Sequence, residues 1–152
     1  RLAMEDLQAG APELLLRTTP APDNSLLQRD LTGYNTLAIK IRAVKQNEQI
    51  ELALLDADGL AFGAELNVST DWQYLLLPLS TLRSTATAMP QAFPMFMPAL
   101  LPAAQAGQTW PPNSDLRQLQ GVQLRFNTGA YTADALGGWH AVELAEVSLI
   151  KR

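Results

Sequence analysis

Hydrophobic and polar residues alternate along much of the chain, with the period of two that is expected of half-buried β-strands. The clearest example is residues 36–44, where aliphatic residues occupy one face while Lys40 and Arg42 occupy the other. Residues 49–56 and 60–66 alternate in the same way on either side of an Asp-Gly turn. These patterns predict one strand followed by a two-stranded hairpin.

Further extended runs, rich in aliphatic and aromatic residues, predict strands at residues 14–18, 72–77, 122–126 and 140–150. In the last run the aliphatic positions change parity near Ala145 or Glu146, which predicts a β-bulge. The segment that contains Met4 and Leu7 fits either a strand or an irregular lead-in. Helical signals are confined to one short turn at residues 114–119, where Ser or Asp is available as a cap.

Many short strands with almost no helix indicate two antiparallel sheets packed face to face. We therefore predict an all-β sandwich, a jelly roll, formed by one domain over residues 1–152. A chain of this length can bury roughly 70% of its unfolded surface, so its core needs no disulfide or metal. Because the sequence opens at Arg1 without a charged-then-apolar leader, we expect a domain excised from a larger protein or a processed product.

A long connection, residues 80–114, separates two of the predicted strands and is much longer than the usual loop of a compact domain. It is rich in proline, methionine and phenylalanine, and includes Phe93, Phe96 and Trp110. This apolar content argues against a solvated, disordered linker. Two interpretations remain open: the segment covers an edge or end of the sandwich, or it lines a binding cleft or docks on a neighbouring domain.

Composition excludes several classes of binding partner and several kinds of reactive site. The net charge is −4 and the basic residues are scattered, so no basic stripe is present that would bind nucleic acid. No apolar run approaches the ~20 residues that span a bilayer, so we expect no membrane partner. The absence of cysteine excludes disulfides, thiolate metal sites and cysteine nucleophiles.

Catalytic patterns are weak, and we predict that the chain is not an enzyme. A glycoside hydrolase needs two carboxylates across a cleft, one of them with a raised pKa. Asp56 and Asp58 belong to a predicted turn, whereas the remaining carboxylates considered fall on strands at positions expected to face solvent: Glu51, Glu65, Glu143 and Glu146. His140 is the single histidine, and no Gly-x-Ser-x-Gly motif accompanies it.

Sugar binding requires aromatic faces flanked by planar polar groups, and the sequence contains a set of residues of both kinds. The aromatic members lie in predicted loops or at strand ends, and the polar members lie nearby in sequence. The loop at residues 128–138 also contains glycines that permit a sharp return or a close backbone approach. The predicted ligand-binding residues are Trp110, Tyr131, Trp139, Gln123, Arg125, Asn127 and His140.

The alternative interpretation of these residues is structural: the tryptophans would cover the ends of the core, while Gln123 and Arg125 would be merely solvated. Three other aromatic residues are assigned to structure rather than to the site. Trp72 and Tyr74 share one strand face and are expected in or near the core, and Tyr34 is expected to be structural.

Four ordered phrases carry a resemblance to a known group: LTGYNTLAI at 31–39, DWQYLLLPLS at 71–80, LQGVQL at 119–124 and VELAEV at 142–147. Over residues 31–152 the chain resembles galactose-binding-domain-like β-sandwiches, which occur as carbohydrate-binding modules and accessory domains in bacterial polysaccharide-degrading enzymes. The resemblance implies a non-catalytic accessory domain of a secreted or periplasmic glycan-degrading enzyme. It would bind polysaccharide or oligosaccharide and adjoin a catalytic domain of the parent chain.

The resemblance leaves two further points open. A structural or interdomain interaction sandwich without sugar binding is the alternative function, with the long connection pressed against another domain or chain. No cofactor is expected, although many sandwiches of this group carry a structural calcium. Oxygen ligands for such an ion would come from residues such as Asp23, Asn24, Asp30 or Glu146.

Overall fold

The computed structural model describes residues 2–4, 15–18, 30–56, 58–88, 100, 101, 103, 107–110, 116–126 and 140–152. In the described part of the chain, two short 3-10 helices accompany the strands, η1 (Leu79–Thr81) and η2 (Leu116–Gln118). The strands are β1 (Leu2–Met4), β2 (Leu15–Thr18), β3 (Thr36–Ala43), β4 (Glu48–Leu55), β5 (Ala61–Val68), β6 (Gln73–Pro78), β7 (Arg83–Thr85), β8 (Thr87–Ala88), β9 (Leu100–Leu101), β10 (Gly121–Phe126) and β11 (His140–Ile150).

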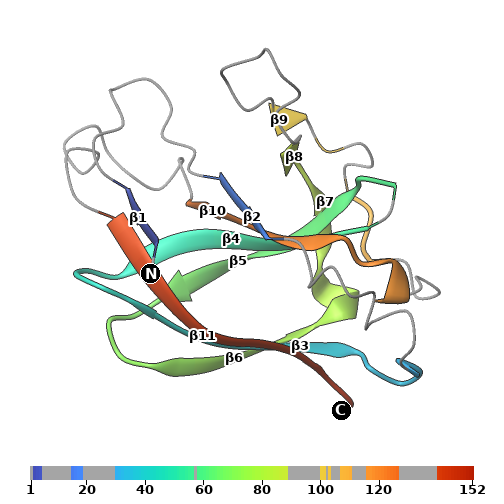
Figure 1. Ribbon diagram of the computed structural model, residues 1–152, viewed down its shortest axis with the longest axis horizontal. Helices are drawn as coiled ribbons and strands as arrows, with labels where there is room; N and C mark the ends of the chain where they lie inside the picture. Colours follow the sequence, from blue (N-terminus) through green and yellow to red (C-terminus); the bar gives the residue numbers. More distant parts are fainter. Residues whose placement is uncertain are drawn as a thin grey trace.

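Two antiparallel sheets form the body of the molecule (Figure 1). The four-stranded sheet has the order β1-β11-β3-β6, and the five-stranded sheet has the order β2-β10-β4-β5-β7. The chain passes repeatedly from one sheet to the other, as in jelly-roll sandwiches, and β8 pairs with β9 in a small separate ribbon. The prediction of an all-β, two-sheet antiparallel sandwich is confirmed.

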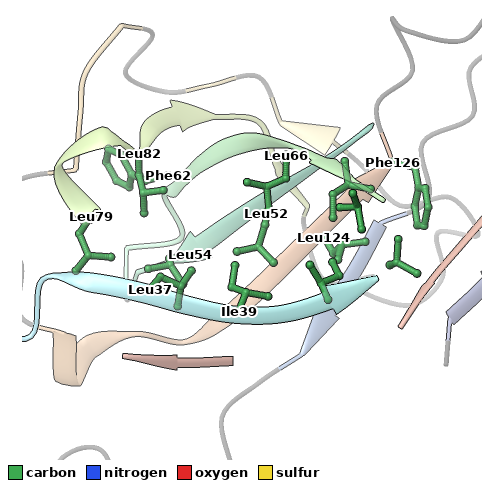
Figure 2. Packing of buried hydrophobic residues seen from close by; sticks show 14 of the residues in the cluster. Leu37, Ile39, Leu52, Leu54, Phe62, Leu66, Leu79, Leu82, Leu124 and Phe126 are labelled. Carbon is green, nitrogen blue, oxygen red and sulfur yellow. The ribbon is translucent and has the colours of Figure 1, made fainter. Parts of the chain in front are cut away.

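The core lies between the two sheets. On β3, the alternating residues Leu37, Ile39 and Ile41 are almost completely buried and face aliphatic residues of β4. Figure 2 shows Leu37 and Ile39 of β3 directed toward Leu54 and Leu52 of the opposite sheet. Removing this apolar surface from water supplies the main favourable term in folding.

Local features predicted from the sequence also appear. The pairing of β11 with β3 shifts register between Leu144 and Glu146, which confirms the bulge. In the β4–β5 hairpin, the Asp56 carboxylate accepts hydrogen bonds from the backbone N–H groups of Asp58 and Leu60 at 3.0 and 2.8 Å. Gly59 has φ of 77°, a conformation that glycine adopts without steric cost, so the turn occurs where the Asp-Gly pair predicted it.

The part of the outer face of the five-stranded sheet that includes Glu51 is covered, which the sequence pattern did not predict, whereas Glu65 and Asn67 on the same face of β5 are exposed. Ala53, Leu55 and Ala61 form a second buried cluster on this face. Glu51 of the same face is also buried, so the expectation that it faces solvent was wrong. A hydrogen bond from the Gln123 side chain to the carbonyl oxygen of Ala86, at 2.8 Å, shows that the chain after β7 lies over this face.

The described parts of the long connection contain short elements of secondary structure. It begins with η1 and β7, and Arg83 of β7 forms an isolated bridge with Thr109. Its start covers an edge of the sandwich, as one of the two interpretations proposed, because β7 pairs with β5 at the margin of the five-stranded sheet. Phe93 and Phe96 lie outside the described residues, so the docking interpretation stays a prediction.

Candidate functional site

Trp110, one of the two tryptophans that the sequence placed in the candidate site, is packed into the core. Its ring meets Phe62 edge to face, with centroids 5.4 Å apart and an interplanar angle of 76°. Its backbone N–H donates to the carbonyl oxygen of Leu82 at 3.0 Å. Only 6% of the residue is exposed. In this position the ring stabilises one end of the sandwich and offers little surface to a ligand.

Gln123 and Arg125 project from the covered outer face of β10. Gln123 has no exposed surface. The Arg125 guanidinium lies 2.6 Å from the Glu51 carboxylate, which also accepts hydrogen bonds from the Thr85 hydroxyl at 2.8 and 2.9 Å. Arg125 is thus paired with Glu51, and Gln123 donates to the carbonyl oxygen of Ala86, so neither side chain is simply solvated.

His140 lies at the start of β11 and is buried against Glu48, with Nδ1 3.0 Å from a carboxylate oxygen. Glu48 begins β4, whereas Trp110 packs on Phe62, which pairs with Leu54 near the other end of that strand. At about 3.3 Å per residue, the six residues from position 48 to 54 span roughly 20 Å. The structure therefore does not bring Trp110 and His140 together, and Asn127, Tyr131 and Trp139 lie outside the described residues.

Among the residues that the structure describes, the exposed aromatic ones, Trp72 and Tyr74, lie elsewhere, on the outer face of the four-stranded sheet. Trp72 is 43% exposed and Tyr74 is 63% exposed, so the expectation that they belong to the core was wrong. Leu76, two residues further along β6, is 38% exposed. We call the exposed surface formed by Trp72, Tyr74 and Leu76, with the neighbouring side chains of Lys40 and Arg42, the aromatic platform.

The backbone pleat explains why these aromatic residues face outward. Successive residues of a strand point to opposite faces, and Leu75 and Leu77 pack against the core, so even-numbered positions of β6 must point away from it. The pairing confirms this assignment, because Tyr74 lies opposite Lys40, whose neighbours Ile39 and Ile41 are buried. Both faces of β6 are apolar, so its own pattern does not show which face points to the core. The pairing with β3, whose outer face is polar, does show it.

Two cations lie over the platform rings. The Lys40 ammonium is 5.7 Å from the centroid of the Trp72 ring and 5.3 Å from that of Tyr74. The Arg42 guanidinium lies 4.9 Å from the Trp72 centroid and forms a 2.6 Å ion pair with Glu143 of β11. Cation–π attraction of this kind, worth roughly 0.5–1 kcal/mol at exposed sites, holds each ring beside a hydrogen-bond donor.

The platform combines two properties on one side of the molecule. Trp72 and Tyr74 are two residues apart, which places them roughly 7 Å from each other along an extended chain. Their exposed ring surfaces are apolar, while Lys40, Arg42 and Glu143 provide donors and an acceptor beside them. Such an arrangement is chemically complementary to a flat ligand that has both a hydrocarbon face and hydroxyl groups.

Two hollows also open beside Tyr34. One of about 580 Å³ lies between the sheets and is lined mainly by aliphatic residues, including Val122 and Val147, with Asp30 on its wall. Hydrogen bonds from the side chain and backbone of Thr32 hold the pKa of the Asp30 carboxyl below its usual value. The other, of about 660 Å³, reaches the small exposed part of Trp110. Tyr34 itself packs partly against the core, consistent with its structural assignment.

Candidate metal ligands do not cluster: within the described ranges, no three His, Asp or Glu residues gather closely enough to hold an ion. Asp23 and Asn24 fall outside those ranges. Asp30 is engaged by Thr32, and Glu146 accepts a hydrogen bond from Ser148 at 3.0 Å. None of the described helices has the length and hydropathy required to traverse a membrane.

Comparison with known proteins adds no family to this description. No protein-family model, no curated protein and no solved structure matches the chain.

Proposed function

We propose that this chain is a non-catalytic carbohydrate-binding domain, and that it binds polysaccharide or oligosaccharide on the aromatic platform. The observation that carries the proposal is the exposure of Trp72 and Tyr74 side by side on the outer face of a β-sandwich. The hydrocarbon faces of a sugar ring would stack on these aromatic rings, and its hydroxyls would bond Lys40, Arg42 and Glu143. This mode of binding needs no cofactor and includes no chemical step.

Physical chemistry favours a sugar over other ligands at this surface. An exposed tryptophan beside an exposed tyrosine leaves apolar area in water, which is a common feature of binding surfaces. Nucleic acid is disfavoured because the chain carries a net charge of −4 and the Arg42 charge is neutralised by Glu143. A surface that places aromatic faces beside the donors of Lys40 and Arg42 and the acceptor of Glu143 fits an extensively hydroxylated ligand.

The biological setting of the proposal comes from the sequence resemblance. A domain of this kind would hold a glycan near an adjoining catalytic domain of the parent chain, in a secreted or periplasmic bacterial enzyme. Tethering to the substrate raises the effective concentration of the catalytic domain at its target, even when the affinity of the binding domain is modest.

Replacing Trp72 or Tyr74 with alanine is expected to weaken polysaccharide binding by at least roughly tenfold, which corresponds to about 1.4 kcal/mol. Each substitution removes a stacking surface, and truncation of aromatic contact residues is often among the most costly changes at an interface. Affinity electrophoresis against soluble plant, algal and animal polysaccharides would identify the ligand, and calorimetry would then measure each variant.

The Trp139→Ala variant is the matched control, because it removes the tryptophan that the sequence placed in a loop site. We expect this variant to bind the polysaccharide with the same affinity as the wild type. If folded wild-type protein is not retarded by any polysaccharide, carbohydrate binding is refuted. If Trp139→Ala loses binding while Trp72→Ala retains it, the ligand binds at the loop instead of at the platform.

A further inference from the structure

The edge of the four-stranded sheet formed by β6 has an unusual composition. The strand reads Gln-Tyr-Leu-Leu-Leu-Pro and contains no charged residue. In the described part of the chain, only β3 pairs with it, and Figure 1 shows β6 at the lower margin of its layer. Exposed edges are ordinarily protected by charges, bulges or covering segments, because their free backbone groups can pair with another strand.

The backbone of this edge can be oriented from one hydrogen bond. The N–H of Leu79, the residue after β6, donates to the carbonyl oxygen of Asn35, the residue before β3, at 2.8 Å. Backbone groups of successive residues point to alternate sides of a strand, so those of Leu77 and Leu75 also face β3. The N–H and C=O groups of Tyr74 and Leu76 consequently face the free edge. Pro78 has the same parity, so its missing N–H removes nothing from the pairing with β3.

We propose that this edge pairs with the β6 edge of a second copy of the chain, antiparallel and about a two-fold axis at Leu75. In this register Tyr74 lies opposite Leu76 of the second copy, and Leu76 lies opposite its Tyr74. These are the residues whose backbone groups face the free edge, so each of the two pairs exchanges two N–H···O hydrogen bonds. Trp72 comes opposite Pro78 beyond them.

The side chains of β6 are complementary to themselves in this register. On the outer face, every pair across the axis joins an aromatic residue to an aliphatic one or to proline, and such cross-strand pairs stabilise sheets. Each chain carries a net charge of −4, but the paired strands contain no charges that repel at close range. A second copy therefore fits the edge in both shape and charge.

The expected dimer is weak. Pairing of one strand edge buries less area than the roughly 1,200–2,000 Å² of a standard stable interface. We therefore expect a dissociation constant in the range of roughly 10 to 500 µM. The dimer would nevertheless join two aromatic platforms into one continuous surface, so that a polymeric ligand with repeated binding units would engage both.

Sedimentation velocity over a wide concentration range tests the dimer. The wild-type 152-residue chain is expected to shift from monomer toward twice the monomer mass as concentration rises. Leu76→Lys should remain monomeric, because it places a charge beside its symmetry-related copy at the centre of the edge. Ser148→Lys is the matched control: it adds the same charge on the same face, in the same cross-strand row as Leu76, but two strands from the edge.

A cross-linking experiment tests the register. Because the chain contains no cysteine, Leu75→Cys would carry a single thiol that faces its own copy across the axis at a Cα separation of about 4.5 Å. It is expected to form covalent dimers under mild oxidation at least roughly tenfold faster than Tyr74→Cys, whose thiol faces Leu76 of the other copy. Circular dichroism verifies that each variant is folded.

Several outcomes would overturn the proposal. A wild-type chain that stays monomeric at 1 mM, a dimer that survives Leu76→Lys, or equal cross-linking of the two cysteine variants would each contradict it. These results leave carbohydrate binding untouched, since that function is measured on the monomer as well.

Discussion

Replacing Phe62 with alanine is expected to lower the free energy of unfolding by about 3–5 kcal/mol. The ring is 1% exposed and lies in the core between the sheets, where it packs edge to face with Trp110. Alanine would lose the apolar transfer energy of the ring and leave a cavity that the surrounding strands cannot fully close. Urea denaturation followed by tryptophan fluorescence and circular dichroism would measure the change.

Tyr74→Ala provides the comparison for Phe62→Ala. It removes an aromatic side chain from the neighbouring sheet, but from a position that is 63% exposed. Its effect on unfolding is expected to stay within about 1 kcal/mol, the range of the exposed cation–π contact with Lys40 that it removes. Similar losses for the two variants would contradict the assignment of Phe62 to the interior and Tyr74 to the surface.

Replacing Arg125 with alanine is expected to destabilise the protein by about 3 kcal/mol. The substitution leaves the buried Glu51 carboxylate without the guanidinium 2.6 Å away. An uncompensated charge in a covered position is costly because neither water nor the protein solvates it fully. Thermal and urea unfolding at neutral pH would quantify the loss.

Arg42→Ala is the matched control for Arg125→Ala, because Arg42 forms an ion pair with Glu143 at the same distance of 2.6 Å. That pair is much more exposed, so its loss is expected to cost no more than about 1 kcal/mol. Equal destabilisation by the two variants would show that Glu51 is open to water, contrary to the structure.

The sequence predicted the strands whose two faces differ in polarity. Thr36–Ala43 places aliphatic residues against the core and Lys40 and Arg42 outside, and period-two patterning is sufficient to identify such a strand. The bulge in β11 was predictable for the same reason, because a change in parity can be repaired by one extra residue. These features depend on local chemistry, which a single sequence records.

The aromatic platform was not predictable in this way. β6 has leucines on both faces, so periodicity does not distinguish the core face from the outer face. Its orientation depends on pairing with β3, a contact between residues more than thirty positions apart. The burial of Glu51 and Gln123 depends likewise on a connection that crosses the sheet from a distant part of the chain. Long-range contacts of this kind are set by tertiary structure rather than by local pattern.

The central claim is that ligands bind on the aromatic platform, and the three tryptophans provide a direct test of it. Each indole N–H gives its own signal in a nitrogen-15 correlation spectrum, and Trp72, Trp110 and Trp139 can be assigned by single substitutions. Titration with the polysaccharide fragment identified by electrophoresis is expected to shift the Trp72 signal while those of Trp110 and Trp139 stay in place. A shift of Trp139 with Trp72 unchanged would place recognition in the loop and contradict the claim.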